Sequence, residues 1–266
     1  MPAATMISTL QGILGLISGA MVGFSLGLVG GGGSVLAVPL MVYVVGVPEP
    51  HIAIGSSAIA VATNAAINLF NHARGGTVIW RVAAVFAVAG IIGAFFGSLL
   101  GKMVDGQKLL ALFALVMLVI AMLMLKTRAR VGVPDVKMSM ANLPAVIGFG
   151  LATGSLSGFF GIGGGFLIVP ALMAATGMPI MNAVSSSLVA VTTFGLTTAA
   201  SYAWSGLVAW DLAGLFIAGG VLGGLVGTWS ARRLSERRGA LNIVFSVVIT
   251  AVALYMLTRS LLHILF

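Results

Sequence analysis

Two glycine runs are the first candidates for binding chemistry. Residues 30–34 read GGGGS, residues 161–165 read GIGGG, and each run is followed by a proline. Glycine disfavours a helix by about 1 kcal/mol per residue, so both runs predict a helix break. A break inside a membrane must be buried or line a cavity, and the N–H groups that start a helix attract anions. The runs therefore predict an anion site comprising Gly31, Gly32, Gly33, Ser34, Gly163, Gly164 and Gly165. The alternative is a turn that needs glycine only for steric reasons.

Uncharged polar side chains follow each glycine run, about 25 residues further on. Hydroxyls and amides can replace the water around an anion and still release it, because they carry no full charge. Ordinary helix–helix hydrogen bonding is the alternative for any one of them. The candidates for the same site are Ser56, Ser57, Asn64, Ser186, Ser187 and Thr193. Asn64 and Asn68 are four residues apart and share one helical face.

Charged residues are expected only near the ends of the apolar segments. Arg74 and His72 are placed at the mouth of the first half, where they could attract anions; ordinary loop charge is the alternative. No acidic or basic residue falls in the middle of a segment, which argues against a proton pump or a cation channel. Neither a metal site nor a cofactor is predicted.

The elements that carry these residues occur twice along the chain. Residues 27–48 match residues 158–179 at a shift of 131, and residues 56–97 match residues 186–227 at a shift of 130. Each half divides into five apolar segments, and the second is short. The segments are 6–29, 33–47, 51–71, 78–101 and 108–126, then 142–161, 164–177, 182–203, 208–230 and 239–262. We predict a first repeat over 1–126, a basic cytoplasmic linker over 127–141 and a second repeat over 142–266.

Composition fixes the broad class. Mean hydropathy is +1.19, and charged residues make up 7% of the chain, against about 25% in soluble domains. The sequence therefore predicts an all-α polytopic membrane protein. Cysteine is absent, which excludes disulfides and thiol relays. The net charge of +8 is better explained by membrane topology than by nucleic acid. Glycines spaced by four at 93, 97 and 101, and at 219, 223 and 227, predict close helix packing.

Charge separates two possible topologies. If the first two segments of each half form one broken span, seven basic residues face one side and six the other. If those segments enter and return, ten basic residues share one face and three the other, which obeys the positive-inside rule. The second arrangement puts both termini outside. It makes the chain two inverted repeats of about five hydrophobic segments, with the first two segments of each repeat broken at a glycine-rich turn.

The doubled pattern resembles the sulfite exporter TauE/SafE permeases. The pattern is a glycine-rich run, a proline six residues on, a Gly-Xaa-Pro, and then a Ser-Ser pair, in both halves. The resemblance implies a transporter of the bacterial inner membrane that moves sulfite or a related sulfur oxyanion or organosulfonate. Ser34 departs from the pattern, because the second run has glycine at that position.

We therefore expect a secondary transporter that exports a small anion by alternating access, in contact with the lipid bilayer and with no nucleic-acid partner. The hypothesis places the four hydroxyls of Ser56, Ser57, Ser186 and Ser187 together at the glycine breaks, near the midplane. Alternatives are an anion channel, a carrier for another small organic anion, and a lipid-facing scaffold. No nucleophile pairs with a histidine, so no enzyme is predicted. Monomer and homodimer both fit the sequence.

Overall fold

The protein is helical throughout the part that the structure describes. The computed structural model describes residues 8–126, 139–161, 165–233 and 249–260, and these contain no strand. Six of the described helices are long and apolar enough to cross a membrane. The larger helices are α1 (Thr9–Val29), α3 (Pro50–Arg74), α4 (Trp80–Met103), α5 (Gly106–Lys126), α6 (Leu143–Phe160), α7 (Gly165–Thr176), α8 (Ile180–Trp204) and α9 (Trp210–Arg233), followed by a helix over residues 249–260. The prediction of an all-α polytopic membrane protein is confirmed.

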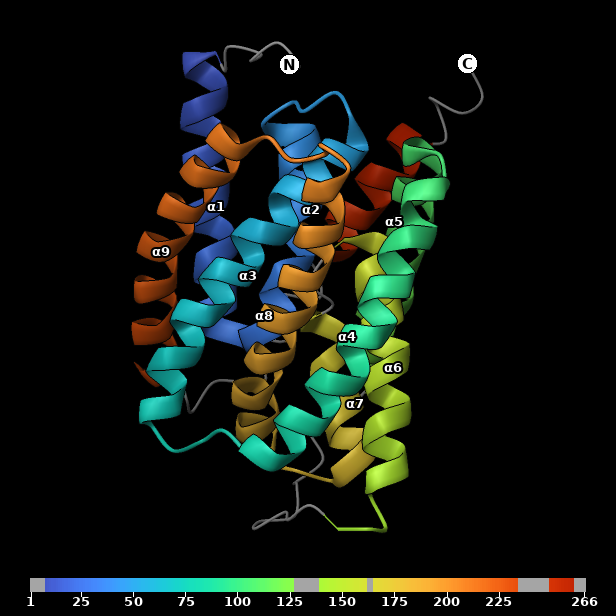
Figure 1. The fold of residues 1–266 in the computed structure, drawn as a ribbon. Coiled ribbons are helices and arrows are strands. Elements are labelled where there is room, and N and C mark those ends of the chain that lie inside the picture. The colour runs from blue at the N-terminus through green and yellow to red at the C-terminus, as the bar shows by residue number, and fades with distance from the viewer. Residues whose placement is uncertain (1–7, 127–138, 162–164, 234–248, 261–266) are drawn as a thin grey trace.

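The first glycine run ends α1 and starts a broken segment. Gly30 has a φ of +69°, which side chains rarely allow, so the chain can leave the helix sharply there. Three short pieces follow, namely the 3₁₀ helix η1 (Gly30–Leu36), α2 (Ala37–Pro39) and the π-helical turn η2 (Leu40–Val44). Pro39 lacks an N–H group and cannot complete an α-helical hydrogen bond, which favours the change of helix type. The broken segment returns the chain to the end of the molecule where α1 begins (Figure 1).

The second half repeats this course. Gly161 ends α6 with a φ of +69°, and α7 has 12 residues, which extend about 18 Å and are too few for a hydrocarbon core of about 30 Å. α1 begins, and the helix over residues 249–260 ends, at the same end of the molecule (Figure 1). The path matches the arrangement in which the first two segments of each half enter and return, and differs from the single broken span.

Glycines on facing helix surfaces allow two pairs of parallel helices to pack closely. α1 packs on α9, and α4 packs on α6. A methyl group on Gly97 would collide with the backbone of α6, and one on Gly223 with the backbone of α1. The prediction that the glycines spaced by four mediate close helix packing is confirmed.

Contacts between the halves recur in matched pairs. For several contacts between residue i of the first half and residue j of the second, the residues at i+130 or i+131 and at j−130 are also in contact. For example, Gly23 contacts Gly220, and the equivalent residues Gly154 and Gly90 are also in contact. In the same way, the contact between Gly30 and Val184 has its equivalent in the contact between Gly161 and Ile54. The equivalent helices α1 and α6 run in opposite directions (Figure 1).

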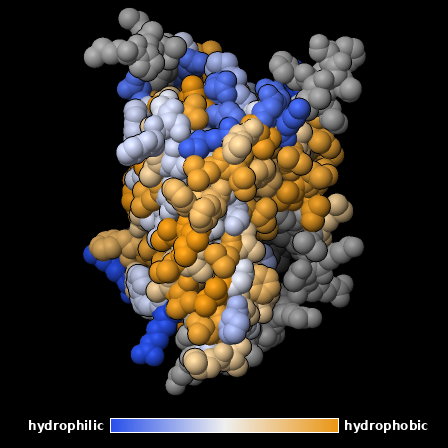
Figure 2. All heavy atoms as spheres, turned by 45° about the vertical axis from the view of Figure 1, so that its right-hand side comes forward, coloured by the Kyte–Doolittle hydropathy of each residue, from blue (hydrophilic) through white to orange (hydrophobic). Residues whose placement is uncertain are grey.

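An apolar band covers the middle of the visible face. Figure 2 shows hydrophobic side chains over the centre of the molecule and hydrophilic ones toward both ends. Large apolar side chains are exposed on several helices, among them Phe96 of α4, Leu112 of α5 and Leu222 of α9. Such an apolar surface suits a lipid environment, because water would not solvate it.

Candidate functional site

The two glycine breaks touch each other inside the molecule. A β-carbon on Gly31 would lie 2.8 Å from the α-carbon of Gly165, and one on Gly165 would collide with the carbonyl of Gly31. Residues 30–36 are all buried. The backbones can approach this closely only because neither glycine has a side chain. Gly163 and Gly164, which the sequence also placed here, lie outside the described residues.

Serines at this junction are hydrogen-bonded to its backbone. The Ser187 hydroxyl of α8 accepts a hydrogen bond from the Gly31 N–H (3.4 Å) and donates one to the carbonyl of Val184 (2.7 Å). Ser34 donates to the carbonyl of Gly31 (2.9 Å). One N–H group of the broken segment therefore already points at a hydroxyl. Gly32 and Gly33 are buried beside it.

Ser56 and Ser186 do not meet at the junction, contrary to the hypothesis that four hydroxyls converge. Ser56 accepts a hydrogen bond from the Ala209 N–H (2.8 Å), and Ser186 accepts one from the Ile79 N–H (3.0 Å). The two loops that supply these N–H groups lie at opposite ends of the molecule (Figure 1). The physical reason is that N–H groups at the start of a helix lack intrahelical acceptors. At the starts of α9 and α4, a serine hydroxyl serves as the acceptor for one of these groups.

Two further candidates bond within their own helices. Ser57 donates to the carbonyl of Ile54 (3.0 Å), and Thr193 donates to the carbonyls of Val189 and Ala190 (3.1 Å each). Ser57 lies one turn after Ile54, whose side chain packs against Gly161 at the second break. In the described conformation these hydroxyls are occupied, so binding an anion would require them to exchange partners.

Asn64 has an unusual environment. Its side chain is 1% exposed, and neither amide atom has a hydrogen-bond partner among the described residues. The neighbouring Asn68 donates to the carbonyl of Asn64 (2.9 Å) and accepts from the Thr228 hydroxyl of α9 (3.0 Å). An unsatisfied buried amide costs about 1–3 kcal/mol. Among the described residues, the Asn64 side chain therefore has one acceptor oxygen and two donor hydrogens that form no hydrogen bond in the interior.

The equivalent position in the second half is apolar. Phe194 packs against Gly90 as Asn64 packs against Gly220, and its ring stacks on Phe86 at 6.2 Å. The two halves therefore differ in polarity at the same place. The amide is confined to the first half, on the face where α3 meets α9.

At the predicted mouth, His72 and Arg74 have different surroundings. His72 Nδ1 lies 3.2 Å from the Ser185 hydroxyl, which in turn lies 2.7 Å from the Thr77 hydroxyl. Asn182 donates to the carbonyl of Thr77 (2.9 Å). This network fastens the loop between α3 and α4 to α8. Arg74 is exposed, with its guanidinium carbon 4.2 Å from the centre of the Phe70 ring.

Some of these contacts had no signal in the sequence. Thr228 lies 160 residues from Asn68, and Asn182 lies 105 residues from Thr77. Both are polar residues in apolar segments, so a hydrogen-bond partner could be expected for each. The sequence spacing could not identify which residue the partner is. Within the described ranges, no group of three or more histidine, aspartate or glutamate side chains could hold a metal ion.

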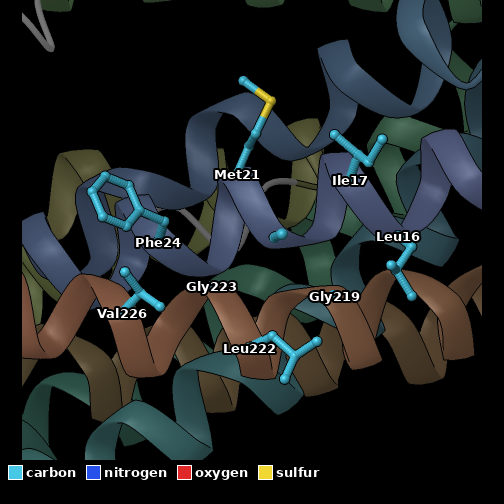
Figure 3. Close-up of a pocket in the computed structure, with 9 residues that line it drawn as sticks. Leu16, Ile17, Met21, Phe24, Gly219, Leu222, Gly223 and Val226 are labelled. Carbon is cyan, nitrogen blue, oxygen red and sulfur yellow. The ribbon is translucent and has the colours of Figure 1, made fainter.

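A groove on the outer face is the wrong kind of site for an anion. It lies between α1 and α9, has a volume of about 470 Å³, and is lined by apolar side chains and glycines. Figure 3 shows Phe24 of α1 close to Val226 of α9, with Met21 and Leu222 pointing to opposite sides of the two helices. It offers no polar side chain to replace the hydration of an anion.

Known proteins with related sequences point to one family. The family model described as "Sulfite exporter TauE/SafE" matches residues 15–256. A "Probable membrane transporter protein" from Xylella fastidiosa (strain 9a5c) is 51% identical over 95% of this chain and 97% of its own length. YunE of Bacillus subtilis (strain 168), also described as a probable membrane transporter protein, is 28% identical over 85% of this chain and 89% of its own length. No solved structure matches the chain. The chain therefore belongs to the sulfite exporter TauE/SafE family and is a membrane transporter.

Proposed function

We propose that this transporter exports a small oxyanion, of the sulfite or organosulfonate class, through the junction of its two glycine breaks. The observation that carries the proposal is the contact between Gly31 and Gly165, because it joins the two broken segments in the interior. Broken backbone at membrane depth commonly forms the substrate site of secondary transporters. The substrate class comes from the family, whose description names sulfite.

The site is assigned to the backbone N–H groups of residues 31–34 and 163–165, with polar side chains around them. Ser187 already accepts from the Gly31 N–H, and the Asn64 amide has no partner among the described residues. The substrate would compete with Ser187 for the Gly31 N–H and would form hydrogen bonds with the Asn64 amide. Ser56 and Ser186 bond to N–H groups at the starts of α9 and α4, and Ser57 and Thr193 bond within their own helices. We therefore assign these four side chains a supporting role in the helices around the junction.

Alternating access follows from treating the halves as inverted repeats. Equivalent helices α1 and α6 run oppositely, and contacts recur when the halves are exchanged. If the two halves exchanged conformations, the resulting arrangement would have a similar free energy to the first. Switching between the two arrangements would open the junction to one side of the membrane and then to the other. The close packing at the junction favours such a carrier over an open anion channel.

Orientation and energetics both suit export. We place the protein in the bacterial inner membrane with the basic loops inside and both termini outside, following the positive-inside rule. Each negative charge that leaves a cell gains about 2.3 kcal/mol per 100 mV of inside-negative potential. His72 and Arg74 then lie at the cytoplasmic mouth. We further propose that residues 1–126 and 142–266 form the two repeats, that residues 127–141 link them, and that transport needs no cofactor and no enzymatic step.

The proposal is tested by flux into proteoliposomes. The purified protein is reconstituted, the membrane potential is set with potassium and valinomycin, and uptake of ³⁵S-sulfite toward the positive interior is followed, with empty liposomes as the control. We expect saturable, potential-driven uptake that organosulfonates inhibit. Uptake that rises linearly with concentration would favour a channel. Absence of flux for sulfite, thiosulfate and organosulfonates would refute the substrate class.

A further inference from the structure

An open cavity with a mixed polar and apolar lining lies at the end of the molecule opposite the His72 network. Its volume is about 230 Å³, and its lining includes Tyr43, Gln107 and Arg259. Three segments distant in sequence form it: the end of η2 with the loop after it, the start of α5, and the helix over residues 249–260. Figure 1 shows these segments gathered at the end of the molecule where α1 begins.

The exposed arginine in this cavity contacts one tyrosine and, among the described residues, forms no ion pair. Arg259 Nε donates to the Tyr255 hydroxyl (3.3 Å), and the guanidinium carbon lies 5.9 Å from the centre of the same ring. Tyr255 in turn packs edge-on against Tyr43, with ring centres 5.3 Å apart. Within the described residues no carboxylate forms a salt bridge with Arg259. Within the described ranges, neither terminal NH₂ group of the guanidinium forms a hydrogen bond, and both lie beside the cavity.

The other polar side chains that line the cavity are uncharged and can donate hydrogen bonds. The Tyr43 hydroxyl lies 3.4 Å from the Ser260 hydroxyl, and the Gln107 side chain contributes an amide. Two carboxylates lie in the adjoining loops, but both are engaged with backbone. Glu49 accepts from the His51 N–H (3.4 Å), and Asp105 accepts from the N–H groups of Gln107 and Lys108 (3.1 and 3.2 Å).

We propose that this cavity binds an oxyanion, with Arg259 as its anchor and Gln107 and Tyr43 as supporting donors. A guanidinium forms two parallel hydrogen bonds with the oxygens of a sulfur or phosphorus oxyanion, which a lysine cannot reproduce. At about 30 Å³ per water molecule, the volume accommodates such an anion with part of its hydration shell. The ligand is either a free oxyanion or the phosphate of a lipid headgroup, because both present the same oxygens.

Binding here is separate from the proposed transport site, since the cavity shares no residue with the glycine junction. Only its assignment to the outer, exit side rests on the proposed function. An anion that leaves the junction would then meet a positive site before bulk water.

The test uses the purified full-length protein and sulfate, which is stable to oxidation. Sulfate binding is measured by calorimetry at low ionic strength for the wild type, Arg259→Gln, Arg259→Lys and the matched control Lys108→Gln. Lys108 lies at the same end and carries the same charge but does not line the cavity. We expect Arg259→Gln to weaken binding at least tenfold, Arg259→Lys to weaken it less, and Lys108→Gln to change it less than twofold. If Arg259→Gln misfolds, Gln107→Leu replaces it.

A second arm identifies the source of the oxyanion. Phosphatidylglycerol that copurifies with the wild type and with Arg259→Gln is quantified, and the protein is also placed in nanodiscs with or without that lipid. Loss of sulfate binding in Arg259→Gln supports a free anion, and loss of retained lipid without a change in sulfate binding supports a headgroup. Wild-type sulfate affinity together with wild-type lipid retention in Arg259→Gln would overturn the proposal. Neither readout depends on transport, so a failure of the flux assay leaves the result interpretable.

Discussion

The amide of Asn64 lies directly against the backbone of Gly220, where a β-carbon on the glycine would collide with it. The glycine makes room for a polar side chain that has no hydrogen-bond partner in the described part of the chain. Phe194 occupies the matching place in the other half, opposite Gly90. The same packing therefore accepts an apolar residue, and the amide is not needed to fill the space.

Asn64→Leu is expected to separate stability from transport. Removing an unsatisfied buried amide should leave the free energy of unfolding unchanged or raise it by about 1–3 kcal/mol, while sulfite flux should fall at least tenfold. Thermal unfolding in detergent and proteoliposome flux measure the two effects. Asn68→Leu is the control, because it breaks the bond to Thr228 and should lower stability. Full flux in Asn64→Leu would remove Asn64 from the site.

Gly165→Ala is expected to impair both folding and flux. The added methyl group would collide with the carbonyl of Gly31, and overpacking of this kind costs about 1–3 kcal/mol. Gly148→Ala on α6 is the matched control, since a methyl group there meets nothing within 4 Å. Thermal unfolding and flux of the two variants are compared at equal protein content. Equal behaviour would mean that the two breaks need not touch.

Ser56→Ala and Ser186→Ala should each lower stability by about 1 kcal/mol, because each leaves an N–H group at a helix start without its acceptor. The two loops are far apart, so the double variant should lose the sum of the single effects. Ser98→Ala is the control, because Ser98 bonds to the carbonyl of Phe95 in its own helix and, among the described residues, to no other group. Chemical or thermal unfolding provides the values, and a double variant no less stable than either single one would contradict the prediction.

The orientation is testable with single cysteines, since the chain has none of its own. Gly75 and Ser205 are equivalent at a shift of 130, are both exposed, and lie in loops at opposite ends of the molecule. A membrane-impermeant maleimide should label Ser205→Cys in intact cells and Gly75→Cys only after lysis. The reverse pattern would invert the topology and place His72 and Arg74 at the outer mouth.

Several helix boundaries in the described part of the chain could be predicted from the sequence. The apolar segment 142–161 corresponds to α6 at Leu143–Phe160, and segment 164–177 corresponds to α7 at Gly165–Thr176. Glycine, proline and hydropathy decide such boundaries locally, and basic residues selected the returning path over the single broken span. Asn64 and Asn68 were also placed on one face correctly, because helical spacing alone determines it.

The partners of individual hydroxyls could not be predicted in the same way. Ser56 and Ser57 are adjacent, yet one accepts from a loop 153 residues away and the other donates within its own helix. That difference depends on which side of α3 faces the loop before α9, and hence on packing between halves. The cavity at Arg259 was missed for the same reason, because its three segments are unrelated in the sequence.

The exchange of contacts between the halves bears on the origin of the protein. α1 of the first half packs on α9 of the second, and α6 of the second packs on α4 of the first. A polypeptide of half this length, inserted twice in opposite orientations, would make every one of these contacts between two separate molecules. Gene duplication and fusion would then have joined an antiparallel pair into one chain. Once the gene was duplicated, one copy could carry asparagine at position 64 while the other carried phenylalanine at position 194.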